Sequence, residues 1–259
     1  MDQIHIRGLR KSFVSAGRLR SVLDDIDLSV ATGEVLGLVG PSGCGKSTLL
    51  NIVAGLDREH EGAVTIQGRP IGEQLGAGFR VAYVFQEPRL LPWYTLTQNL
   101  EFVLEAGGFA RAEWARRIDD VLQAVRLGEF RHFYPAQLSG GMQQRASIAR
   151  AFCIDPDILL LDEPFSALDE LTARALRQSL LELWQRFRTT IVFVSHNAFE
   201  AAFLADRILV MGEGRIHQEL DLRGTARPRS YDDPAVFDAS RQVVHHLERQ
   251  AARQKAARA

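Results

Sequence analysis

Short stretches in which every residue is apolar or glycine recur along the chain and constrain its fold more than any other feature. They are Val35 to Val39, Val81 to Phe85, Ile158 to Leu161, Ile191 to Val194 and Ile208 to Met211. A strand without polar positions is typical of a parallel sheet that is covered on both faces. Between the third and fourth stretches, apolar residues recur at helical spacing, namely Leu176, Leu180, Leu183, Trp184 and Phe187. Because strands alternate with helices, the pattern predicts an α/β fold with a mostly parallel central sheet.

Two regions depart from this alternation. Apolar and polar residues alternate from Ile4 to Ile6 and from Ile26 to Val30, which predicts an antiparallel N-terminal β subdomain. No strand pattern occurs from about Glu87 to Asp155, where an amphipathic helix is marked by Trp114, Ile118, Val121, Leu122 and Val125. We interpret this interval as an inserted helical subdomain. We therefore expect one domain over residues 1–235, with the insertion at about 87–155, and a helical tail over residues 236–259.

The composition argues against several classes of protein. With 46% hydrophobic residues, 24% charged residues and a formal net charge of −1, the 259 residues are typical of a soluble globular protein. The 31 basic and 32 acidic residues give no global excess of positive charge for binding nucleic acid, and only a local basic patch stays open. No apolar run exceeds five residues, whereas roughly 20 are needed to span a bilayer. With only Cys44 and Cys153 and no secretory pattern, we expect a cytosolic chain without disulfides.

A phosphate-binding pattern directly follows the first apolar stretch. The segment Gly40-Pro41-Ser42-Gly43-Cys44-Gly45-Lys46-Ser47 fits G-x-x-x-x-G-K-[ST], and Thr48 comes next. Glycines allow a tight loop whose backbone N–H groups converge on an anion, and a helix that begins near Lys46 adds its positive end. We expect Lys46 to reach the β- and γ-phosphates of a nucleotide and the Ser47 hydroxyl to bind Mg²⁺. The alternative is a glycine-rich turn with a surface lysine. Under either interpretation, only the small size of Cys44 matters.

Two carboxylates follow the third apolar stretch. Asp162 stands where the carboxyl end of the strand meets the crevice in which α/β sheets bind ligands, so it can hold Mg²⁺ through water. Glu163 comes next and is expected to orient or deprotonate an attacking water molecule. The alternative for this pair is a helix N-cap followed by a surface acid. The phosphate loop favours the catalytic interpretation.

A second anion-binding pattern lies within the helical interval. Ser139, Gly140 and Gly141 precede a helix expected over Met142 to Ala151, so they combine a hydroxyl, flexible backbone amides and a helix N-terminus. The chain has one phosphate loop, so the second cradle requires the nucleotide of another chain. The sequence from Leu138 onward, LSGGMQQR, resembles the signature motif of the ATP-binding cassette (ABC) ATPase family, and the resemblance covers nearly the whole chain. It implies a RecA-like core, ATP as the nucleotide, and a head-to-tail homodimer that sandwiches two ATP molecules.

Further positions match this family in chain order. The resemblance implies that Phe13 stacks on adenine, that Gln86 contacts Mg²⁺ and water, and that Asp169 lies in a segment crossing the dimer interface. It also implies that His196 is a switch residue that contacts the γ-phosphate, which makes His196 a catalytic residue together with Lys46 and Glu163. The alternatives are a core role for Phe13 and a structural role for His196.

One position departs from the family pattern. The residue after the switch histidine is usually Asp, and here it is Asn197. The amide keeps the hydrogen bonding of this position and removes one negative charge near the γ-phosphate.

Two segments resemble the ATPases of the nitrate, aliphatic sulfonate and taurine importers, namely residues 85–93 (FQEPRLLPW) and 162–172 (DEPFSALDELT). The resemblance implies an ATP-hydrolysing subunit that drives uptake of a small anionic solute through a separate membrane permease. Such a subunit is peripheral at the cytoplasmic face of the inner membrane and is served indirectly by an extracytoplasmic solute-binding protein. Exposed Leu90, Leu91 and Trp93 are expected to anchor a permease helix; the alternative is that they pack inside the helical subdomain.

Another class of function stays open at this point. The chain could be a soluble ABC-type or other P-loop NTPase that acts as a regulator or on nucleic acid, although the balanced charge argues against this. The end of the chain, residues 245–259, has four basic residues and one acidic residue. We interpret it as a solvated helix end, with contact to anionic lipid headgroups as the alternative.

Overall fold

The computed structural model describes residues 2–15, 17–71, 79–225 and 227–258, without the side chains of residues 15 and 253–258. These residues form two compact units. The first unit combines the described residues up to 71 with those from Thr190 onward, and the second runs from Phe79 to Thr189. Each unit is described by itself below.

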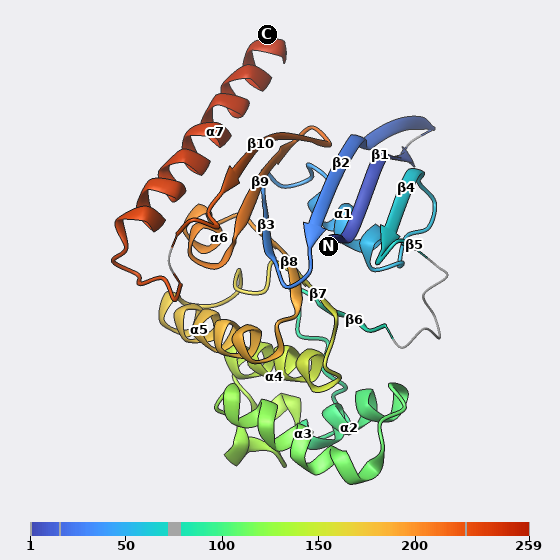
Figure 1. The fold of residues 1–259 in the computed structure, drawn as a ribbon, viewed down its shortest axis with the longest axis vertical. Coiled ribbons are helices and arrows are strands. Elements are labelled where there is room, and N and C mark those ends of the chain that lie inside the picture. Colours follow the sequence, from blue (N-terminus) through green and yellow to red (C-terminus); the bar gives the residue numbers. More distant parts are fainter. Residues whose placement is uncertain (1, 16, 72–78, 226, 259) are drawn as a thin grey trace. The chain divides into compact units, whose positions relative to one another are not determined.

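The first unit contains the predicted antiparallel sheet (Figure 1). Its strands are β1 (Asp2–Ser15), β2 (Arg18–Ala31), β4 (Glu61–Ile66) and β5 (Arg69–Pro70), in the order β2-β1-β4-β5. The alternating apolar residues of β1 and β2 are buried, as expected, and they are Ile4, Ile6, Ile26, Leu28 and Val30. Sequence analysis missed β4, because its first three residues are exposed and only Val64 and Ile66 mark its buried face.

A second group of strands in this unit contains three of the predicted parallel strands. Strand β3 (Val35–Val39) lies between β8 (Thr190–Ser195) and β9 (Arg207–Gly212) and is parallel to both. Every residue of these three strands is buried, which explains their lack of polar alternation. Strand β10 (Arg215–Asp221) closes an antiparallel hairpin with β9.

Three helices complete the first unit: α1 (Lys46–Val53), α6 (Ala198–Leu204) and α7 (Pro234–Arg258). Helix α7 lies beside α6 (Figure 1). Aromatic rings of α7 and of the segment before it contact rings of α6. The rings of Phe203 and Tyr231 lie 4.4 Å apart, and the ring of Phe237 lies 5.6 Å from that of Phe199. The predicted C-terminal helix is therefore held at its beginning by an apolar contact with α6.

The second unit contains two parallel strands and most of the helices. Strand β6 (Val81–Val84) pairs with β7 (Ile158–Asp162). Between them lie α2 (Leu96–Ala106), α3 (Arg111–Ala124), α4 (Gly140–Cys153) and the 3-10 helices η1 (Gly128–Phe130) and η2 (Pro135–Gln137). Helix α5 (Glu170–Phe187) follows β7. Every residue from 87 to 155 is described and none lies in a strand, in agreement with the predicted helical insertion.

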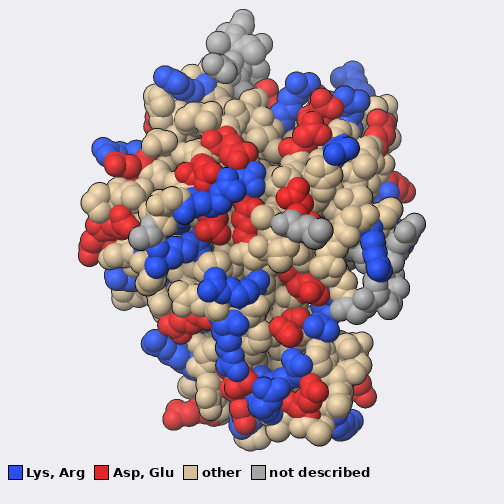
Figure 2. All heavy atoms as spheres, viewed as in Figure 1, with Lys and Arg blue, Asp and Glu red and all other residues tan. Residues whose placement is uncertain are grey.

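The molecular surface carries both signs of charge. On the face in Figure 2, basic and acidic side chains are interspersed, in line with the near-zero net charge. Among the helices that the structure describes, none combines the length and the apolar character needed to cross a membrane.

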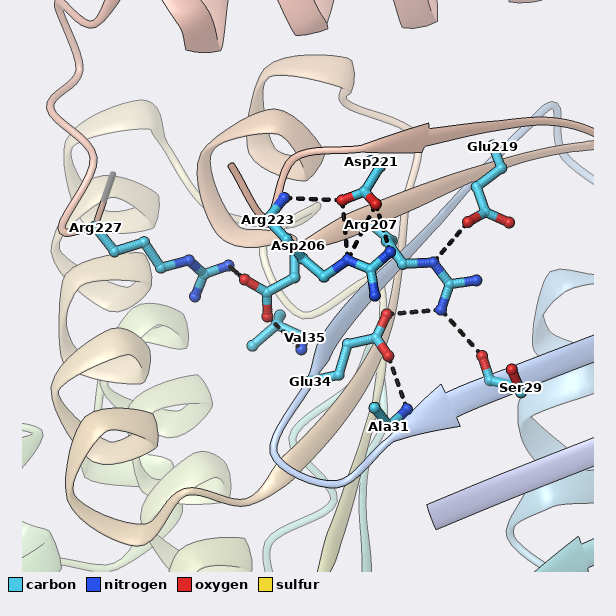
Figure 3. Close-up of polar contacts among 10 residues, drawn as sticks. All are labelled: Ser29, Ala31, Glu34, Val35, Asp206, Arg207, Glu219, Asp221, Arg223 and Arg227. Carbon is cyan, nitrogen blue, oxygen red and sulfur yellow. Dashed lines mark hydrogen bonds and ion pairs between the residues drawn. The ribbon is translucent and has the colours of Figure 1, made fainter. Parts of the chain in front are cut away.

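A buried arginine connects β9 to the turn before β3 (Figure 3). Arg207 donates hydrogen bonds to Glu34 at 2.8 Å, to Glu219 at 2.7 Å and to the carbonyl oxygen of Ser29 at 3.0 Å. Glu34 is only 6% exposed, and its second carboxylate oxygen accepts the backbone N–H of Ala31 at 2.7 Å. Since an unpaired buried charge is costly, Arg207 and Glu34 depend on each other.

The dependence of Glu34 on Arg207 can be tested by substitution. We expect Arg207→Met to lower the free energy of unfolding by about 3 kcal/mol, because the Glu34 carboxylate stays buried without its cation. Arg223→Met is the matched control, since it breaks an exposed ion pair with Asp221 and should leave stability unchanged. Urea denaturation followed by circular dichroism measures both variants. Equal stability of the two would contradict the role given to Arg207.

Candidate nucleotide site

The predicted site residues fall in both units, and each group is described within its own unit. In the first unit, the phosphate loop connects the end of β3 to α1. Gly40 lies so close to β9 that a Cβ atom there would stand 2.4 Å from the carbonyl oxygen of Met211. Gly45 has a φ of 105°, and a Cβ atom there would stand 2.7 Å from the carbonyl oxygen of Val22. These close approaches explain why both positions require glycine.

The Lys46 side chain turns back over this loop. Its ammonium donates hydrogen bonds to the carbonyl oxygens of Gly40 at 2.8 Å and Pro41 at 3.0 Å. The Cys44 sulfur lies 3.9 Å from the same nitrogen, and burial raises the pKa of the Cys44 thiol, so the thiol stays protonated at neutral pH. The exposed residues of the loop are Pro41, Ser42, Gly43 and Ser47, and Thr48 is half-buried.

The register of two parallel strands places His196 at the same sheet edge as the phosphate loop. Val39 of β3 lies opposite Ser195 of β8. The residue after each strand therefore leaves the sheet at the same level, and these residues are Gly40 and the exposed His196. Ligands of α/β proteins bind at this carboxyl edge. Within the first unit, the structure thus brings the predicted switch histidine to the predicted phosphate site.

Asn197 is the N-cap of α6. Its side-chain oxygen accepts the backbone N–H groups of Phe199 at 2.9 Å and Glu200 at 3.3 Å. Asn and Asp are about equally good N-cap residues, because either offers an oxygen at this position. The amide therefore retains the capping geometry of the carboxylate usual in the family.

Phe13 lies in β1 and is 44% exposed, which leaves ring surface for stacking. The Lys11 ammonium lies 4.7 Å from the centroid of the Phe13 ring. The same ammonium is held by the Asp57 carboxylate at 2.8 Å, and Lys11 is 5% exposed. Sequence analysis did not identify Lys11, although a lysine two residues before Phe13 on a strand shares its face.

In the second unit, the register of β6 and β7 brings Gln86 and Asp162 to the same edge of the sheet. Val84 lies opposite Leu161, so Phe85 leaves β6 at the level of Asp162, and Gln86 follows Phe85. The Tyr83 hydroxyl donates a hydrogen bond to Asp162 at 3.3 Å. Burial and the Asp162 charge raise the pKa of Tyr83, so this hydroxyl remains a donor. Tyr83 was not identified from the sequence; a tyrosine within an otherwise apolar strand is the signal that marks it.

Glu163 has a φ of 47°, in the left-handed region that residues other than glycine rarely adopt. Seven other described residues besides glycine share a positive φ, so this conformation marks the tight turn after β7. The Glu163 carbonyl oxygen accepts the Ser166 hydroxyl at 3.0 Å, and the Ser166 oxygen in turn accepts the Gln86 amide at 3.2 Å. Ser166 therefore connects Gln86 to the turn that carries Glu163.

The signature segment begins α4. The Ser139 hydroxyl caps this helix by accepting the backbone N–H of Met142 at 3.3 Å. Gly141 packs against α5, because a Cβ atom on it would stand 2.4 Å from Cγ2 of Thr172. Asp169 caps α5 and accepts the Thr172 N–H at 3.0 Å. Hydrogen bonds from the Thr172 side chain and backbone lower the pKa of Asp169, so it is ionised at neutral pH.

The side chains that were expected to bind Mg²⁺ carry suitable donor atoms. Ser47 offers a hydroxyl in the first unit, while Gln86 and Asp162 offer amide and carboxylate oxygens in the second. Mg²⁺ prefers oxygen ligands and binds proteins through one or two carboxylates together with phosphate oxygens. The residues present therefore fit this ion.

A glycine loop at the carboxyl end of a buried parallel strand, followed by a helix that begins at a lysine, defines a P-loop nucleotide-binding protein. Comparison with known protein families identifies which kind. The family model described as ABC transporter matches residues 23–166. This chain belongs to the ABC transporter family and is one of its ATPases.

Individual relatives and solved structures agree with this family. The aliphatic sulfonates import ATP-binding protein SsuB of Bacillus subtilis (strain 168) is 42% identical over 236 residues, which cover 90% of this chain and 89% of the relative. A protein of the same description from Pseudomonas syringae pv. tomato is 46% identical over 245 residues, with 93% and 97% covered. A dimeric ATP-binding cassette solved in a post-hydrolysis state with ADP and Pi has a TM-score of 0.77 at 32% identity, with 85% and 99% covered.

The packing of Gly141 against Thr172 gives a test of the signature segment. We expect Gly141→Ala to lower the free energy of unfolding by about 1–3 kcal/mol, because the added methyl overlaps Cγ2 of Thr172. Gly140→Ala is the control, since no atom lies within 4 Å of a Cβ there. Adding Thr172→Ser to Gly141→Ala removes Cγ2 and should restore most of the loss. Urea denaturation measures all three, and wild-type stability of Gly141→Ala would refute this packing.

Proposed function

We propose that this chain hydrolyses ATP to drive uptake of an aliphatic sulfonate, or a similar small anion such as taurine or nitrate, through a separate membrane permease. The observation that carries the hydrolytic part is the position of Glu163 directly after Asp162, at the end of the buried strand β7. The relatives at 42% and 46% identity, which are described as aliphatic sulfonates import proteins, support the transport part.

The proposed reaction uses residues of both units. Phe13 stacks on the adenine, and backbone N–H groups of the phosphate loop, other than at Pro41, bind the phosphates. Lys46 exchanges its bonds to the loop carbonyls for bonds to β- and γ-phosphate oxygens. Glu163 orients or deprotonates the attacking water, while His196 contacts the γ-phosphate. Ser47, Gln86 and Asp162 would hold Mg²⁺, which would neutralise part of the phosphate charge.

The second anion cradle requires a second copy of the chain. In the proposed head-to-tail homodimer, Ser139, Gly140 and Gly141 of one protomer bind the nucleotide held by the phosphate loop of the other, and Asp169 lies at the interface. The dimeric state of the cassette with ADP and Pi supports this assembly. ATP bound by both protomers favours the closed dimer, and hydrolysis removes this bridge.

Exposed aromatic residues of the second unit are the proposed permease contact. Trp93 is 67% exposed, Phe102 is 48% exposed and Tyr134 is 45% exposed. Leu90 and Leu91 are half-buried, so of the three predicted anchors Trp93 offers the most surface. Large aromatic side chains supply much of the binding energy at protein interfaces. In this proposal the chain is peripheral at the cytoplasmic face of the membrane, and an extracytoplasmic binding protein delivers the solute.

The catalytic part of the proposal predicts a trapped state. Glu163→Gln should bind ATP and accumulate a closed dimer with little turnover, because the amide keeps the size of the side chain but cannot accept the proton of the water. Size-exclusion chromatography with ATP and a phosphate-release assay measure these properties. Lys46→Ala is the contrasting variant, which should lose ATP affinity and give no dimer. Normal turnover by Glu163→Gln would remove this residue from the base role.

The transport part predicts that a loaded binding protein stimulates ATP hydrolysis by the assembled transporter. The chain is reconstituted in vesicles with its permease, and ATP hydrolysis is measured with binding protein loaded with an alkanesulfonate, taurine or nitrate. We expect the largest stimulation with the alkanesulfonate. Trp93→Ala should reduce this stimulation while leaving hydrolysis by the isolated chain unchanged. The absence of stimulation by all three would contradict the importer assignment, and stimulation by another of the three would correct the solute.

A further inference from the structure

The exposed His196 lies between two buried polar residues. Ser195 is 2% exposed and ends β8, while Glu200 is 7% exposed and lies in the first turn of α6. The Ser195 hydroxyl donates a short hydrogen bond of 2.6 Å to the Glu200 carboxylate. The same hydroxyl lies 3.4 Å from the Asn197 carbonyl oxygen, and because it has one proton, the closer and charged acceptor takes it.

Ser195, Asn197 and Glu200, which flank His196 in the sequence, are joined by a closed ring of hydrogen bonds. The Ser195 oxygen accepts the backbone N–H of Asn197 at 2.9 Å. The Asn197 side chain accepts the backbone N–H of Glu200 at 3.3 Å, and Glu200 returns to Ser195 through its carboxylate. The backbone is therefore fixed on both sides of His196, while the imidazole itself remains exposed.

The far end of α6 is fixed as well. The buried guanidinium of Arg229 donates hydrogen bonds to the carbonyl oxygens of Ala202 at 2.9 Å and Ala205 at 2.6 Å. These carbonyls lie at the C-terminal end of the helix, where they carry partial negative charge. Hydrogen bonds thus hold α6 at both ends.

Burying a carboxylate costs more free energy than burying an apolar side chain of similar size, because the carboxylate loses its hydration. The carboxylate provides a directional contact that an apolar side chain lacks, since a short charged hydrogen bond fixes one of its oxygens relative to the Ser195 hydroxyl. We propose that Ser195 and Glu200 are positioning residues for His196, which hold its backbone so that the imidazole meets the γ-phosphate. This inference rests on the γ-phosphate role proposed above for His196.

The test separates positioning from stability. In the full-length chain, Ser195→Ala and Glu200→Leu each remove the hydrogen bond, and we expect kcat for ATP hydrolysis to fall about tenfold, with the Kd for ATP unchanged. Ser195→Thr keeps the hydroxyl and Glu200→Gln keeps an acceptor oxygen, so both should stay within about threefold of the wild type. Ser179→Ala, which removes another buried serine hydroxyl from α5, is the matched control and should hydrolyse ATP normally.

A double-mutant cycle identifies the residue through which the pair acts. Ser195→Ala is added to His196→Ala, and the remaining hydrolysis is measured with radiolabelled ATP in single-turnover experiments. With no imidazole left to position, the added change should alter the rate by less than about twofold. A loss as large as in the wild-type background would overturn the inference, as would a parallel loss of ATP affinity and thermal stability. Wild-type turnover by His196→Ala itself would overturn the proposed role of His196, and the inference with it.

Discussion

The parallel pairing of β3 with β8 is the constraint on which the first unit's site depends. Because Val39 lies opposite Ser195, the phosphate loop and His196 leave the sheet at one level. A similar arrangement occurs in the second unit, where Val84 lies opposite Leu161, Asp162 ends β7, and Gln86 follows one residue after Phe85. A slip of one residue in either register would turn the following side chain to the other face. Complete burial of β3 and β8 makes such a slip costly, so the apolar strands determine where the polar chemistry lies.

Contacts of the backbone define the phosphate loop as much as side chains do. Gly40 lies against the carbonyl of Met211, and Gly45 lies against that of Val22, so both β9 and β2 pack closely against the loop. The loop is therefore shaped by strands that are distant from it in the sequence. A preformed set of N–H groups loses little conformational freedom on binding phosphate. The glycines of the motif thus serve the packing of the unit and the binding of the anion together.

The sequence predicted the elements that follow simple periodic rules, and it predicted less well what depends on tertiary contacts. The apolar stretches and the α3 stripe at Trp114 and Ile118 correspond to observed strands and a helix. Strand β4 was missed, because its exposed half has no apolar alternation. Tyr83, Ser166 and Lys11 were missed for another reason: each acts through a hydrogen bond or ring contact with a residue on another element, and no spacing rule encodes such a partner. The predicted boundaries at residues 87, 155 and 235 stay predictions.

Lys46 shows how a buried charge is kept available for its ligand. Lys46 is 5% exposed, and a buried charge would be unstable without partners. The carbonyls of Gly40 and Pro41 supply these partners from the loop itself. Phosphate oxygens carry full negative charge, so they form stronger hydrogen bonds with an ammonium than neutral carbonyls do. In the proposed site, nucleotide binding therefore exchanges one set of acceptors for another at a side chain that is already buried, so the desolvation of the lysine does not oppose binding.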